Sequence, residues 1–331
     1  MVDTLILASN DFIVMLQHSL AGLIPVMQFF SFLGQEEFYL LVMPLLVWTV
    51  DYNLGVRLGV MLNISNTLTN LVKYSFHKPR PYWVDQDIQG LSAGESGFGA
   101  PSGHAANAMS LYGLLAASIK KKWAIYAAAF FIFFIGFSRP FLGMHSVFDI
   151  VLGWTLGGVI LILFLRWEPA VMAWFGKMQL SAKILNLLGI SLALILAGAV
   201  ILQSTSDFNI PQVWKANALA AYPEEPIDPT NLNSVITTAA GLFGLGAGAF
   251  WLASKGGFHT PGTYLQYFLR FVIGIIGVLV FWKGLGAVFP SSQDILGFSL
   301  RFLRYTLVAF WISGLGPFVF KKLGLAAVET A

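Results

Sequence analysis

The stretch WAIYAAAFFIFFIGFSRPFLGMHSVFDIVLGWTLGGVILILFLR, residues 123–166, decides the fold of this chain. Two long apolar runs flank a short join that carries Arg139, His145 and Asp149. An apolar run of about 20 residues predicts a helix that crosses a lipid bilayer. Since the ionisable residues fall where one such helix ends and the next begins, the stretch predicts a membrane helix pair with a polar site at one boundary.

The composition of the whole chain also favours a membrane protein. Of its 331 residues, 57% are hydrophobic and 11% are charged, whereas an ordinary soluble domain has about a quarter charged residues. So few charges cannot cover a water-facing surface, and membrane lipids are the expected partners of the apolar excess. The net charge of +3 is too small to indicate nucleic-acid binding. The chain has no cysteine, which excludes disulfides and cysteine metal sites.

Ten apolar segments are recognisable, and they predict an all-α, polytopic transmembrane helical bundle. Two segments are marginal, because 36–50 is short for a span and 12–33 contains His18 and Pro25 and could lie along the interface. The ten segments lie near 12–33, 36–50, 56–76, 104–119, 123–141, 145–166, 184–203, 235–254, 269–288 and 303–320.

Basic residues orient the predicted bundle. If the helices alternate, most Lys and Arg residues fall on one face and most acidic residues on the other. Positively charged loops stay in the cytoplasm, so the long polar loops 77–103 and 204–234 are expected on the extracytoplasmic side. The opening, Met1-Val2-Asp3-Thr4, lacks the basic flank of a cleavable signal peptide. This favours a bacterial inner membrane.

Ionisable residues near membrane depth form three clusters, and such residues are functional by default. They lie at the end of the third apolar segment, the start of the fourth, and between the fifth and the sixth. Alternating helices bring these ends to one side, so the clusters are expected to meet at one membrane boundary. The clusters are Lys73 with Arg80; Pro101-Ser102-Gly103-His104; and Ser138-Arg139 with His145 and Asp149.

Part of this set is suited to holding phosphate. Lys73, Arg80 and Arg139 supply positive charge for a phosphate dianion and its transition state. Ser102 and the backbone amides near Gly103 lie at a predicted helix N-terminus, where N–H groups and the helix dipole favour anions. The sequence therefore predicts these five residues as the phosphate-binding set.

The rest of the set is suited to phosphoryl transfer. His145 and Asp149 are four residues apart, so they share a helix face, and the carboxylate can fix the imidazole tautomer while the other nitrogen attacks. His104 comes from a different helix and can protonate the leaving oxygen, then take a proton from water. We predict these three as catalytic residues that need no metal and no other cofactor.

The three motifs resemble the signature of the type-2 phosphatidic acid phosphatase superfamily, with all eleven residues in order and at the family's internal spacings. The resemblance covers about residues 30–165. It implies a six-helix core within domain 1–166, a phosphohistidine on His145, His104 as acid/base, and inhibition by vanadate. Residues 167–331 then form a C-terminal transmembrane extension of unknown role. The motifs are Lys73-x6-Arg80-Pro81, Pro101-Ser102-Gly103-His104 and Ser138-Arg139-x5-His145-x3-Asp149.

Finer resemblances point to more than one substrate. The opening Leu33-Gly34-Gln35-Glu36-Glu37-Phe38-Tyr39 is similar to that of the sphingosine-1-phosphate phosphatases. By contrast, Arg80-Pro81-Tyr82-Trp83-Val84 is closer to the glucose-6-phosphatases, and Gly103 stands where the sphingosine-1-phosphate phosphatases typically have Thr. The resemblance leaves the substrate open.

The predicted function is metal-independent hydrolysis of a lipid phosphate monoester or diphosphate. A site at the membrane boundary can accept a headgroup phosphate while the lipid tails stay in the bilayer. The same residues would also serve a lipid phosphotransferase or a sugar-phosphate phosphatase. A lipid transporter or scramblase is the alternative of another class; among segments seven to ten, only Lys283 points to a translocation path.

Overall fold

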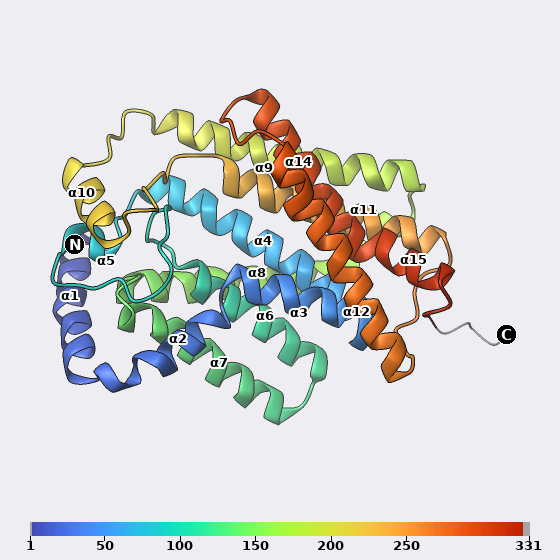
Figure 1. Ribbon diagram of the computed structural model, residues 1–331, viewed down its shortest axis with the longest axis horizontal. Helices are drawn as coiled ribbons and strands as arrows, with labels where there is room; N and C mark the ends of the chain where they lie inside the picture. Colours follow the sequence, from blue (N-terminus) through green and yellow to red (C-terminus); the bar gives the residue numbers. More distant parts are fainter. Residues whose placement is uncertain (1, 327–331) are drawn as a thin grey trace. The chain divides into compact units, whose positions relative to one another are not determined.

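The computed structural model describes residues 2–326, and the side chains from residue 9 onward (Figure 1). All its regular elements are helices, and no strand occurs in the described range. The predicted all-α fold is therefore confirmed. The chain forms two compact units, each assembled from three separate segments. The first unit is Met1–Phe38, Leu68–Leu165 and Ala197–Asn231; the second unit is Tyr39–Thr67, Arg166–Leu196 and Leu232–Ala331.

In the first unit, α6 packs along α7, and α2 also lies against α7 (Figure 1). Glycines in α8 allow its close approach to α6. A Cβ atom on Gly157 would lie 2.4 Å from the carbonyl oxygen of Ala106, and one on Gly153 would lie 2.6 Å from that of Ser102. This contact fixes the start of α8 beside the start of α6. The unit contains α1 (Val2–Ser19), η1 (Ala21–Leu23), α2 (Ile24–Phe32), α5 (Pro81–Val84), α6 (Gly103–Ile119), α7 (Lys122–Phe141), α10 (Gln212–Ala221) and parts of α4 (Tyr52–Phe76), α8 (Val147–Gly176) and α9 (Leu180–Ser204).

In the second unit, α11 packs against α14 and η4, again through small residues. A Cβ atom on Gly244 would lie 2.4 Å from the carbonyl oxygen of Thr306. Arg270 is fully buried and donates hydrogen bonds to the carbonyl oxygens of Trp48 and Leu325, which ties distant segments together. The unit contains most of α3 (Glu36–Leu45), then η2 (Leu46–Val50), α11 (Asn233–Ser254), α12 (Tyr264–Leu279), η3 (Val280–Gly284), α13 (Leu285–Val288), α14 (Ile295–Phe310), η4 (Trp311–Leu315) and α15 (Gly316–Lys322).

Six described helical stretches are long and apolar enough to cross a membrane, so the chain is an integral membrane protein. The expected count of ten spans is not confirmed. The first segment is bent by 84° between Ser9–Ser19 and Ala21–Phe32 and would be a seventh span only as a broken pair. The six stretches are Lys122–Phe141, Val147–Gly176, Leu180–Ser204, Asn233–Ser254, Tyr264–Val288 and Ile295–Lys322.

Candidate active site

All eight predicted site residues belong to the first unit, where they lie at or beside the ends of five helices. Six of them are buried, and the other two, Gly103 and His104, are partly buried. The chain places them as follows: Lys73 in the last turn of α4; Arg80 directly before α5; Ser102, Gly103 and His104 at the start of α6; Arg139 in the last turn of α7; His145 just before α8 and Asp149 in its first turn.

The His145 imidazole lies between a carboxylate and a guanidinium. Its Nδ1 is 3.5 Å from Oδ2 of Asp149, and its Nε2 is 3.1 Å from Nη1 of Arg80. A guanidinium can only donate, so Nε2 must be the accepting nitrogen of the ring. The proton of a neutral ring is then on Nδ1 and faces the carboxylate. This tautomer leaves the Nε2 lone pair on the side of the arginine.

Asp149 is held in turn by the local backbone. Its Oδ2 accepts a hydrogen bond of 2.8 Å from the Ser146 amide, and its own amide donates to Oγ of Ser146 at 3.2 Å. Its carbonyl oxygen accepts from the Ser102 amide at 2.9 Å, which links the N-termini of α6 and α8. The reciprocal Ser146–Asp149 bonds cap α8 and aim the carboxylate at His145.

The Arg80 side chain is fixed by several acceptors. Its Nε donates to the carbonyl oxygen of Gly97 at 2.8 Å, and its Nη1 donates to that of Met144 at 3.1 Å. Its Nη2 forms an ion pair of 2.6 Å with Glu95. A guanidinium with this many partners is a rigid donor group, as recognition of a phosphoryl oxygen requires.

Glu95 joins the two arginines that were predicted to bind phosphate. One carboxylate oxygen pairs with Arg80 and the other with Arg139. Desolvation raises the pKa of Glu95, but the charges of Arg80 and Arg139 outweigh it and hold this pKa well below its usual range. Positive charge on His145 or His104, when either ring is protonated, would lower the pKa of Glu95 further.

Sequence reasoning missed Glu95 as a site residue. It lies in the irregular stretch between α5 and α6, where no helical or strand period relates it to the motifs. Three acidic residues, Asp85, Asp87 and Glu95, lie between the Arg80 motif and the His104 motif, and nothing in the sequence singles out Glu95 among them.

The start of α6 presents the second histidine. Oγ of Ser102 caps the helix by accepting from the Ala105 amide at 3.4 Å, and its predicted role in binding phosphate stays a prediction. The His104 ring lies against Gly34, where a Cβ atom would be 2.7 Å from its Cδ2. Within the described part of the chain, nothing hydrogen-bonds to Nε2 of His104.

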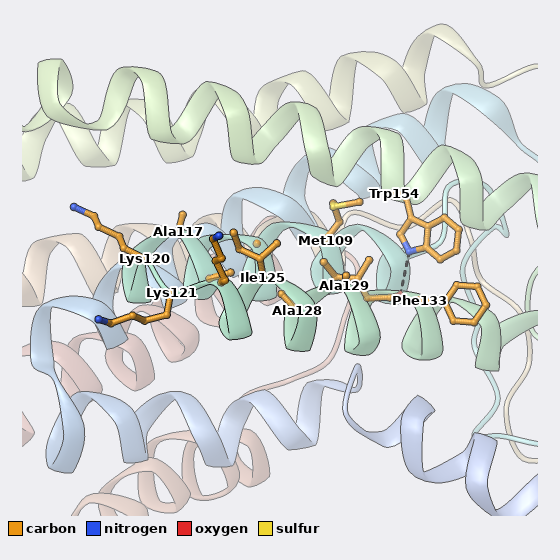
Figure 2. A pocket seen from close by; sticks show the side chains of 13 residues that line it. Met109, Ala117, Lys120, Lys121, Ile125, Ala128, Ala129, Phe133 and Trp154 are labelled. Atoms are coloured by element: carbon orange, nitrogen blue, oxygen red, sulfur yellow. Dashed lines mark hydrogen bonds between the residues drawn. The ribbon is translucent and has the colours of Figure 1, made fainter.

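Two further observations concern possible metal sites and the position of a hollow in the first unit. Among the residues whose side chains are described, no group of three or more His, Asp or Glu residues could hold a metal ion. Figure 2 shows a hollow of the first unit that contains none of the predicted site residues. It lies along α6 and α7, with Trp154 of α8 in its lining, and its lining is apolar except for Lys120, Lys121 and Lys122.

Comparison with known families matches both halves of the chain. Residues 54–173 match the PAP2 superfamily, and residues 236–328 match the transmembrane extension of PAP2 superfamily phosphatases. The first match contains all three motifs, so the family resemblance inferred from them is confirmed. The second match lies in the segment that was expected to be a C-terminal transmembrane extension.

Comparison with curated proteins finds relatives at modest identity. A probable sphingosine-1-phosphate phosphatase of Dictyostelium discoideum is 29% identical over 140 residues, 37% of this chain and 33% of that protein. Lipid phosphate phosphatase delta of Arabidopsis thaliana is 30% identical over 147 residues, covering 39% and 34%. Sphingosine-1-phosphate phosphatase 2 of Mus musculus is 29% identical over 143 residues, covering 41% and 40%. The matches thus span two fifths or less of each relative. No solved structure matches the chain.

Proposed function

Because this chain is a PAP2 superfamily protein with the family's transmembrane extension, we propose that it is a phosphatase of phosphorylated lipids. The observation that carries the proposal is the line of contacts from Asp149 through His145 to Arg80. It gives His145 a fixed tautomer and a lone pair directed at a phosphate-binding group, which is what an attacking imidazole needs.

The proposed reaction has two steps. In the first, Nε2 of His145 forms a bond to phosphorus, the phosphorus–oxygen ester bond breaks, and the leaving alkoxide takes a proton from protonated His104. In the second, neutral His104 takes a proton from water, whose oxygen attacks phosphorus. The phosphorus–nitrogen bond then breaks, and its electron pair returns to Nε2. Inorganic phosphate and the lipid alcohol are the products.

Four of the other predicted site residues have roles in this scheme. Asp149 stabilises the positive charge that develops on the His145 ring. Arg80 and Arg139 are fixed donors for the phosphoryl oxygens, and Lys73 adds a further positive charge. Metal ions have no part in the proposed steps, because the charge is balanced by these side chains.

A phosphate-release panel tests the function. We expect the purified protein to release phosphate from a long-chain-base phosphate, phosphatidic acid or a polyprenyl diphosphate, and to keep doing so in the presence of a metal chelator. The names of the relatives make sphingosine-1-phosphate the first substrate to test. Release from glucose 6-phosphate alone would overturn the lipid assignment. Radiolabelled phosphate that appears in a second lipid, rather than in solution, would identify a phosphotransferase.

We further propose that the site faces the extracytoplasmic side of a bacterial inner membrane. Since the chain has no cysteine, single introduced cysteines report their side without background. Glu224 is exposed in the 204–234 loop, and Lys121 is exposed between α6 and α7. An impermeant maleimide applied to intact spheroplasts is expected to label Glu224→Cys and to leave Lys121→Cys unlabelled until the membrane is opened. The reverse pattern would contradict the orientation.

A further inference from the structure

Glu95 lies where a phosphate group would have to bind. Its two carboxylate oxygens each accept from the Nη2 nitrogen of one arginine, at 2.6 Å for Arg80 and in a short contact for Arg139. These are the donors that the proposed function assigns to two phosphoryl oxygens. A phosphate and the Glu95 carboxylate cannot both occupy them.

Most other donors of the two arginines are taken by the protein, but Nε of Arg139 is buried and has no hydrogen-bond partner among the described residues. Nη1 of Arg139 donates to Oγ of Ser31 and, at 3.4 Å, to Oγ of Ser92. Arg80 uses Nε and Nη1 for backbone carbonyl oxygens and for His145. Displacement of Glu95 therefore frees one Nη2 nitrogen on each arginine, in addition to the unpartnered Nε of Arg139.

Burial shows which member of the Arg80–Glu95–Arg139 triad can move. Both arginine side chains are 1% exposed, whereas the Glu95 side chain is 29% exposed. Glu95 also lies in an irregular stretch, with Gly94 before it and Gly97 two residues after it. The Glu95 carboxylate is partly exposed, whereas the two guanidinium groups are buried and held by other partners. Exchange with phosphate therefore moves Glu95 and leaves the arginines in place.

We propose that Glu95 is the resident counter-ion of the phosphate site, which substrate phosphate must displace, and that it sets the charge a ligand needs in order to bind. The proposal rests on the proposed function of this site. One carboxylate neutralises one of the two arginine charges and prevents them from lying buried without a partner. A phosphomonoester dianion brings more charge and more acceptor oxygens than the carboxylate it replaces.

A phosphodiester carries only one negative charge and gains little from the same exchange. A site in a bilayer is surrounded by phosphodiester headgroups. Because a phosphodiester gains little by displacing Glu95, these headgroups do not occupy the phosphate site. Glu95 is thus a specificity-determining residue, selecting monoesters and diphosphates over the bulk phospholipids around the site. The Arg80–Glu95–Arg139 triad stays ionised at neutral pH, because the pKa of Glu95 is held low, so this selection operates under ordinary conditions.

Competitive inhibition by two soluble anions tests this role. Inorganic phosphate and dimethyl phosphate are titrated against lipid phosphate turnover by the full-length protein, the Glu95→Gln variant and the Glu224→Gln variant. Apparent affinity falls with the fraction of sites that are open to ligand, so removing a dominant competitor is expected to tighten phosphate inhibition by at least about fivefold. Dimethyl phosphate is expected to inhibit Glu95→Gln only. Glu224→Gln, an exposed change in another loop, is expected to match the wild type.

Weaker inhibition by phosphate would overturn the proposal. If Glu95 only anchors the arginines, Glu95→Gln will weaken phosphate inhibition and raise the KM, which overturns the proposal.

Should Glu95→Gln fail to fold, Glu95→Asp keeps the charge but is one methylene too short to span both guanidinium groups. It is expected to tighten phosphate inhibition as well, and weaker inhibition would overturn the proposal. A wild-type protein without turnover would reject the proposed function itself, whereas normal turnover with no tightening rejects only the role of Glu95.

Discussion

Replacing His145 with alanine is expected to abolish phosphate release, with a loss of at least about 10⁴-fold in kcat. Nε2 of this ring is the acceptor that faces Arg80, and its Nδ1 lies 3.5 Å from Asp149. Without the imidazole, phosphate can still bind to the arginines, so the KM should change far less than kcat. Initial rates on purified protein measure both constants.

The matched control for this prediction is His18→Ala. His18 is an exposed histidine in the last turn of α1 and shares none of the contacts of His145. Its replacement is expected to leave the rate unchanged, and both variants should unfold at temperatures close to that of the wild type. A His145→Ala protein that folds and still turns over at a tenth of the normal rate would rule out the phosphohistidine.

The local order of the site could be predicted from the sequence. Each motif is short, and the four-residue spacing correctly places Asp149 beside His145. The predicted shared helix face is wrong, because His145 lies just before α8 and only Asp149 is on the helix. Alternation of apolar segments then brings the Arg80 and His145 motifs to the same side, and the two residues are in fact in contact. These predictions need only local geometry and the rule that polar groups collect at membrane boundaries.

Other features depend on the path of irregular backbone or on pairing over long distances. Glu95 reaches both arginines through a loop whose course no periodicity determines. The second unit combines Tyr39–Thr67 with Leu232–Ala331, and neither segment carries a local signal of the other. The 84° bend of the first segment follows residue Ser19 and is preceded by no proline. Hydropathy therefore identifies an apolar run there without showing that it is broken.

Replacing His104 with alanine is expected to separate the two steps of the reaction. With a lipid phosphate, the alkoxide leaving group needs a proton, and loss of a general acid typically costs about 10²–10⁴-fold in rate. With p-nitrophenyl phosphate, the leaving group is already stable as an anion, so phosphorylation of His145 should be nearly normal. Hydrolysis of the phosphohistidine should still be slow, because no base activates the water.

The measurable consequence is a burst of p-nitrophenol release by the His104→Ala variant. His104→Ala is expected to release close to one equivalent of p-nitrophenol rapidly and then to turn over slowly, with radiolabelled phosphate retained on the protein after quenching in alkali. The His104→Ala/His145→Ala double variant should retain no label, because the acceptor nitrogen is gone. Equal losses with both substrates and no retained label would mean that His104 acts only in binding. The partly buried ring at the start of α6, with Nε2 accepting no hydrogen bond from the described residues, is positioned for the chemical role.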